Sequence, residues 1–220
     1  MSRHPASARK GIRAKATLMA GVAGVALVAA SVMAPANATV TSPSVKGNTT
    51  ISLGGKAINT LQTNGCGPLT ATALGGATAI TTAKGGIKLV FKVSGLDIQD
   101  GSGAIRLNHS GGVTLENACY TISLTGFRIT NFGTVNETSD FDLNALVKGT
   151  GVREVVGVLD MSGAQIVFSG STVRVNQMNL LTSDDGAKIL NQLALGTDTG
   201  PFASGDKVGF AKTKVTFTGI

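Results

Sequence analysis

The stretch GAIRLNHSGGVTLENACYTISLTGFRI, residues 103–129, gathers side chains that are rare elsewhere in the chain. It holds the single tyrosine, Tyr120, and also Cys119 and His109, each one of only two residues of its type. His109 and Ser110 are the base and nucleophile types of a hydrolase, but neighbouring residues of a strand point to opposite faces of the sheet. No G-x-S-x-G nucleophile elbow is present. We therefore expect a protein that is not an enzyme.

Paired carboxylates occur at Asp97 with Asp100 and at Asp140 with Asp142, where they could serve acid–base chemistry. They lie at strand ends and turns, however, where aspartate is common for conformational reasons. The D-x-D-x-N run that starts at Asp140 resembles a calcium loop, but Ala145 stands where such a loop requires glycine. One histidine after residue 38 and two cysteines are too few for a zinc site. We expect no metal site.

Residues 1–38 have the pattern of a secretory signal peptide. Five basic residues lie between Arg3 and Lys15, an apolar run follows, and Ala36-Asn37-Ala38 offers a small-residue cleavage site. The most apolar section, Leu18 to Met33, is shorter than the roughly 20 residues that span a bilayer. We expect a secreted or cell-wall-associated protein without a permanent membrane span; a retained anchor is the alternative.

Removal of this leader changes the charge balance. Of the 19 Lys and Arg residues five lie in the leader, which leaves 14 against 12 Asp and Glu. These charges are scattered singly along the sequence, without a basic stripe interleaved with aromatic residues, so nucleic-acid binding is not expected. An aromatic fraction of 4% without tryptophan also argues against a carbohydrate-binding face, because such faces are usually exposed Trp and Tyr rings.

The two cysteines, Cys66 and Cys119, follow the leader of a chain that we expect to reach an oxidising compartment. That context favours one structural disulfide over a reactive thiol or a metal site. In the chain-entropy model, a disulfide that closes the loop from Cys66 to Cys119 contributes about 4 kcal/mol to stability.

The elements that position these residues are short segments rich in Val, Ile, Thr and Phe, divided by Gly, Asn, Asp and Ser. This pattern indicates an all-β, antiparallel β-sandwich-like domain. We expect a flexible lead-in over 39–50 and a single β-domain over 51–220, with one short helix near residues 183–195 that has Thr182 as its N-cap and Gly196 at its C-terminus. The predicted strands are 87–93, 104–107, 112–116, 119–129, 141–149, 153–161, 164–170, 172–180 and 208–219.

In order along the chain, GAIRLNHSGGVTLENACYTISL, VVGVLDMSG, LLTSDDGAKILNQ and FASGDKVGFAKTKVTF resemble the haem-receptor HtaA-type domain of secreted actinobacterial proteins. The resemblance implies a β-fold that binds haem at one edge, through a tyrosine ligand near the start of the domain supported by a histidine in a Gly-rich turn. His109 matches that supporting histidine. This chain departs from the pattern, because it has no Trp and its only tyrosine is Tyr120.

We interpret the chain as a non-enzymatic envelope or extracellular domain that acts by binding, with an unknown partner and no cofactor. The alternative is a carrier of haem or another small apolar ligand centred on His109, because imidazole is a common axial ligand of iron. Otherwise His109 is a hydrogen-bonded, partly exposed residue near a turn.

Overall fold

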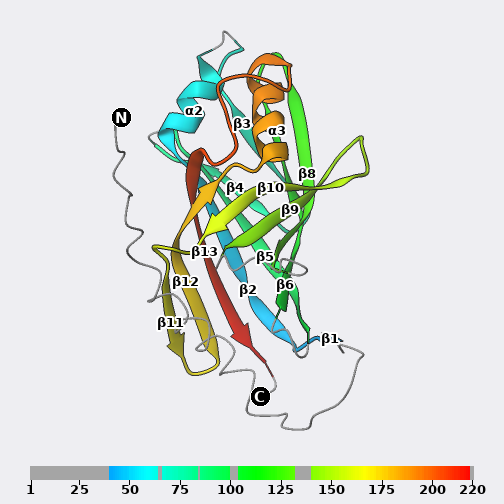
Figure 1. Cartoon of the computed structure of the whole chain (residues 1–220), viewed down its shortest axis with the longest axis vertical. Coiled ribbons are helices and arrows are strands. Elements are labelled where there is room, and N and C mark those ends of the chain that lie inside the picture. The colour runs from blue at the N-terminus through cyan, green and yellow to red at the C-terminus, as the bar shows by residue number, and fades with distance from the viewer. Residues whose placement is uncertain (1–39, 64–65, 84, 100–103, 132–139, 219–220) are drawn as a thin grey trace, which may run out of the picture. The chain divides into compact units, whose positions relative to one another are not determined.

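A computed structural model describes residues 40–63, 66–83, 85–99, 104–131 and 140–218. These residues belong to one compact unit, in which strands dominate and two helices occur in the described ranges (Figure 1). The helices are α2 (Gly55–Gln62) and α3 (Asp184–Leu195). The strands are β1 (Val40–Thr41), β2 (Val45–Leu53), β3 (Thr70–Leu74), β4 (Thr78–Thr81), β5 (Ile87–Gln99), β6 (Ala104–Ser110), β7 (Gly112–Glu116), β8 (Thr121–Thr130), β9 (Phe141–Val147), β10 (Arg153–Asp160), β11 (Gln165–Ser169), β12 (Thr172–Leu181) and β13 (Lys207–Phe217).

The all-β prediction is confirmed, but the strands do not form a sandwich. All belong to one sheet, and the pairing runs β5-β2-β13-β12-β10-β9-β8. β6 then pairs with both β8 and β5, which closes the sheet on itself. A sandwich would need two separate sheets packed face to face. The sequence pattern could not distinguish the two arrangements, because inward and outward residues alternate in both.

The interior of this closed sheet is filled by the alternating apolar residues of its strands. Along β5, Ile87, Leu89, Phe91 and Val93 are all buried, as their period of two predicts. Phe91 packs against Phe127 of β8 with ring centroids 4.3 Å apart. Inward-facing residues from distant parts of the chain therefore share one core.

Glycine bulges bend the strands. The register shifts between Val93 and Gly95 on β5 and between Thr125 and Arg128 on β8. At the second bulge Gly126 has φ +57, a left-handed conformation that glycine adopts without strain. Bulges bend a strand and redirect the side chains beside them, and these two lie at the site described below.

The predicted helix is confirmed as α3, with a different first residue. Ser183, and not Thr182, is the N-cap: its Oγ accepts a hydrogen bond of 2.9 Å from Gly186 N. Gly196 ends the helix with φ 71, as predicted. The helix α2 was not predicted from the sequence; its buried residues are Ala57, Ile58 and Leu61. Figure 1 shows both helices at one end of the sheet.

The folded unit begins before the predicted boundary. The sequence indicates a flexible lead-in over 39–50, but residues 45–50 belong to β2, where Thr49 and Thr50 are buried. The predicted leader, residues 1–38, lies outside the described residues and remains a prediction. In the described ranges no helix is both long enough and apolar enough to span a membrane.

Candidate functional site

His109 lies inside β6 and is only 6% exposed. Its Nε2 lies 2.8 Å from Thr49 Oγ1 on β2, and its Nδ1 lies 3.3 Å from the carbonyl oxygen of Phe127 on β8. Thr49 Oγ1 lies 2.9 Å from Thr213 Oγ1 on β13. The expectation of a partly exposed histidine is therefore wrong, although its hydrogen bonding is confirmed. Residues from four strands meet here in one buried polar chain.

Burial lowers the pKa of His109 to about 4, against the smaller opposing effect of the Phe127 carbonyl, so the imidazole is neutral at pH 7. Because a carbonyl oxygen only accepts hydrogen bonds, we assign the ring proton to Nδ1, which donates to Phe127. Nε2 then accepts from the Thr49 hydroxyl, which in turn accepts from Thr213. His109, Thr49 and Thr213 therefore each have a hydrogen-bond partner. A buried polar network whose members are all hydrogen-bonded favours one unique packing of the core.

The other rare side chains of residues 103–129 have structural roles. The predicted disulfide between Cys66 and Cys119 is present, with Cα atoms 5.4 Å apart. Tyr120 Oη donates a hydrogen bond of 3.1 Å to the carbonyl oxygen of Leu195, at the C-terminus of α3. The stretch therefore gathers a core histidine, a covalent link and a contact to the helix, and these are not brought together at one reactive centre.

Three arginines from three strands line a cleft of about 300 Å³. Arg106 comes from β6, Arg128 from β8 and Arg153 from β10. The two bulges described above lie beside them, because Ser94 of the β5 bulge and Gly126 of the β8 bulge also line the cleft. Leu107 of β6 and Ile129 of β8 are buried, and their sequence neighbours are Arg106 and Arg128. Since neighbouring residues of a strand point to opposite faces, these two arginines lie on the outer face of the sheet.

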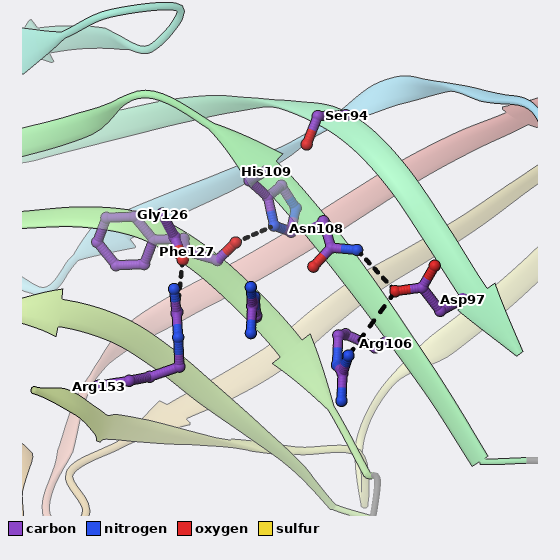
Figure 2. Close-up of a pocket in the computed structure, with 9 residues that line it drawn as sticks. Ser94, Asp97, Arg106, Asn108, His109, Gly126, Phe127 and Arg153 are labelled. Atoms are coloured by element: carbon purple, nitrogen blue, oxygen red, sulfur yellow. Dashed lines mark hydrogen bonds and ion pairs between the residues drawn. The ribbon is translucent and has the colours of Figure 1, made fainter. Parts of the chain in front are cut away.

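Figure 2 shows how polar contacts hold two of the arginines in this cleft. Arg153 Nη1 donates a hydrogen bond of 2.6 Å to the carbonyl oxygen of Gly126. Arg106 Nη1 lies 3.9 Å from Asp97 Oδ2, which also accepts a bond of 3.0 Å from Asn108 Nδ2. Asp97 is the only carboxylate among the described residues that line the cleft.

The cleft carries an excess of positive charge. Partial burial lowers the pKa of Arg153, and repulsion from Arg128 and Arg106 lowers it further. Within the described part of the chain, the guanidinium of Arg128 has no hydrogen bond or ion pair. Arginine presents five N–H donors in a planar fork that suits carboxylate and phosphate groups. The arrangement can therefore bind an anion.

His109, which the sequence indicated as a candidate, lines this cleft, whereas nothing in the sequence pointed to the three arginines. They are spaced 22 and 25 residues apart and belong to no motif. Among the predicted carboxylate pairs, Asp140 and Asp97 accept hydrogen bonds from Met161 N and Asn108 Nδ2 respectively, whereas Asp100 lies outside the described residues. Over the described ranges, no group of three or more His, Cys, Asp or Glu side chains could hold a metal ion.

Comparisons with known proteins bear on the fold. No family model matches the chain, and no curated protein matches it in sequence. The C-terminal domain of HtaA from Corynebacterium glutamicum aligns in structure with a TM-score of 0.52 and 14% identity, over 79% of this chain and 99% of that domain. The haem-binding protein HtaB from the same organism aligns with a TM-score of 0.46 and 12% identity, over 82% of this chain and 96% of HtaB. The resemblance to the HtaA fold is thereby confirmed.

Proposed function

We propose that this chain is a secreted, non-enzymatic binding protein that holds the carboxylate or phosphate group of its ligand in the arginine cleft. The observation that carries the proposal is that three arginines and a single carboxylate line the same cleft. Repulsion among like charges opposes this arrangement when no ligand is present, and a bound anion would relieve it.

Haem is the second candidate, favoured by the fold shared with the HtaA domain. His109 does not fit an axial ligand in this conformation, because the lone pair of Nε2 accepts from Thr49 and Nδ1 donates to Phe127. The resemblance implies a tyrosine beside the supporting histidine, but here the neighbour of His109 is Thr49. An alcohol hydroxyl is not among the usual haem ligands, which are His, Cys, Met and Tyr.

Calorimetric titration of the full chain with citrate and with inorganic phosphate tests the cleft. Arg128→Gln removes the guanidinium that has no partner in the described residues, and a hydrogen bond to a charged group contributes about 1.5–3 kcal/mol. We expect the Kd to rise roughly 10- to 100-fold. Lys148→Gln, which removes one exposed positive charge from a turn that does not line the cleft, is the matched control. Equal affinities in wild type and Arg128→Gln, or no binding of either anion, would overturn the proposal.

Hemin titration separates the two candidates. If the hydrogen bonds of His109 keep its ring nitrogens from binding iron, hemin at micromolar concentration produces no Soret shift that depends on His109. A shift that disappears in His109→Ala, with the fold of the variant verified by circular dichroism, would instead establish the haem carrier.

A further inference from the structure

A second surface of the molecule collects positive charge. The strands β5, β2, β13 and β12 lie side by side, with β11 at the edge (Figure 1). Along one row of paired positions Arg174 faces Lys214, Lys214 faces Asn48, and Asn48 faces Lys92. Directly paired residues point to the same side of a sheet. Lys46, Lys88 and Lys212 each lie an even number of residues from a member of this row in the same strand, so they point to the same side of the sheet. We call the surface formed by these six cations the basic face: Lys46, Lys88, Lys92, Arg174, Lys212 and Lys214.

The strands of the basic face carry one acidic residue, Asp97 of β5, which lies in the arginine cleft near Arg106. β2, β11, β12 and β13 contain no Asp or Glu. None of the six cations forms an ion pair with another described residue. Arg174 and Lys214 are directly opposite each other, and like charges in such a pair are destabilising. The face therefore has the charge complementary to an anionic partner.

A hollow of about 470 Å³ lies within the basic face and carries groups of a different kind. Phe210 lines it and is 48% exposed, although Lys207 Nζ lies 4.0 Å from the centroid of its ring. Lys212 lies beside it. The remaining polar lining consists of two hydroxyl and three amide side chains: Thr50, Ser52, Gln165, Asn176 and Gln177.

Backbone strain occurs at the same hollow. Gln177 has φ 61, the only positive φ of a residue other than glycine in the described ranges. It lies where the register of β12 and β13 shifts between Val175 and Met178, and such a bulge redirects side chains. Conformations of this kind carry a free-energy cost and cluster at binding sites.

We propose that the basic face binds an acidic polysaccharide, with one sugar ring in the hollow. An exposed aromatic ring packs against the C–H face of a pyranose, while amides and hydroxyls both donate hydrogen bonds to sugar hydroxyls and accept them. The cations around the hollow pair with the carboxylate or sulfate groups of the polymer. A lipid surface needs no hollow lined by amides, and this hollow offers nucleic acid a single aromatic ring. The low aromatic content of the sequence had argued against such a face, but one phenylalanine suffices for one sugar.

Binding of the full chain to immobilised polygalacturonate tests this inference, with neutral dextran, single-stranded DNA and phosphatidylglycerol vesicles as competitors. Lys214→Glu places a carboxylate opposite Arg174, so the fold should tolerate it, and we expect at least a tenfold loss of affinity. Phe210→Ala should weaken polygalacturonate binding at constant charge. Lys148→Glu makes the same charge change in a turn outside the face and should have little effect.

The two proposals fail separately. The arginine cleft shares no lining residue with the hollow, so Phe210→Ala should leave the Kd for inorganic phosphate unchanged, and Arg128→Gln should weaken polygalacturonate binding much less than Lys214→Glu does. The inference would be overturned if Lys148→Glu weakened binding as much as Lys214→Glu, since net charge alone would then be responsible. Stronger competition by DNA or vesicles than by free polygalacturonate, or no loss on Phe210→Ala, would overturn it equally.

Discussion

The buried imidazole of His109 makes the stability of the fold depend on pH. Burial lowers its pKa from 6.5 to about 4, so between these values the unfolded chain binds a proton that the folded chain does not. The contribution of the neutral imidazole is complete above pH 6.5 and is lost as pH falls toward 4. At about 1.36 kcal/mol for each pKa unit, the loss is about 3 kcal/mol.

Urea unfolding followed by circular dichroism at pH 7.5, 6 and 4.5 measures this effect. His109→Gln removes the titrating group, so the free energy of unfolding of the variant should vary less with pH than that of wild type. Burial raises the pKa of Asp142, which acts in the opposite direction, but this carboxyl is present in both proteins. The difference between the two curves therefore isolates the imidazole.

Should His109→Gln fail to fold, an NMR titration of the wild-type imidazole gives the same information. His109 is the only histidine after residue 4, so its signal is easily assigned in a protein expressed without residues 1–38. We expect the ring to stay neutral until pH approaches 4. A midpoint near 6.5, or identical pH profiles for wild type and variant, would refute the assignment of a desolvated neutral histidine.

Three other predictions come from the fold and a fourth from the leader pattern. Cys66→Ser should lower stability by about 4 kcal/mol under non-reducing conditions, and two free thiols in denatured wild-type protein would contradict the disulfide. Thr49→Val leaves His109 Nε2 without a donor and should cost about 1–3 kcal/mol in urea unfolding; an unchanged midpoint would refute the hydrogen bond. Leu193→Ala, at a position with 0% exposure, should cost about 2–5 kcal/mol in thermal unfolding, and a loss below 1 kcal/mol would contradict its packing. Mass spectrometry of exported protein should show an N-terminus at Thr39, whereas an uncleaved chain would support the membrane anchor.

Local pattern was enough to find most of the strands. β7 spans the predicted 112–116, and β9 to β13 match their predicted ranges to within two residues at each end. β2 was missed because its sequence, VKGNTTISL, is rich in small polar residues; Thr49 and Thr50 are buried by strand pairing and a hydrogen bond that no local pattern reveals. α2 was missed because eight residues starting at a glycine give too few turns for a clear helical period.

The closure of the sheet was beyond local pattern as well. It depends on β6 pairing with both β5 and β8, and each of those strands alternates in the same way whether the sheet is open or closed. The arginine cleft depends on that closure, because Arg106 meets Arg128 and Arg153 only when β6 lies beside β8. A candidate site made by strand pairing leaves no motif in the sequence.

The basic face shows why scattered charges are a poor guide to the surface of a sheet. Lys212 and Lys214 are two residues apart and so share a face, but Lys46 and Lys92 lie in two other strands, β2 and β5. Register alone brings Lys92 into one row with Lys214, through Asn48. A net charge near zero after leader removal therefore does not describe this molecule's electrostatics: positive side chains lie together on one face, and the sequence order of the strands conceals them.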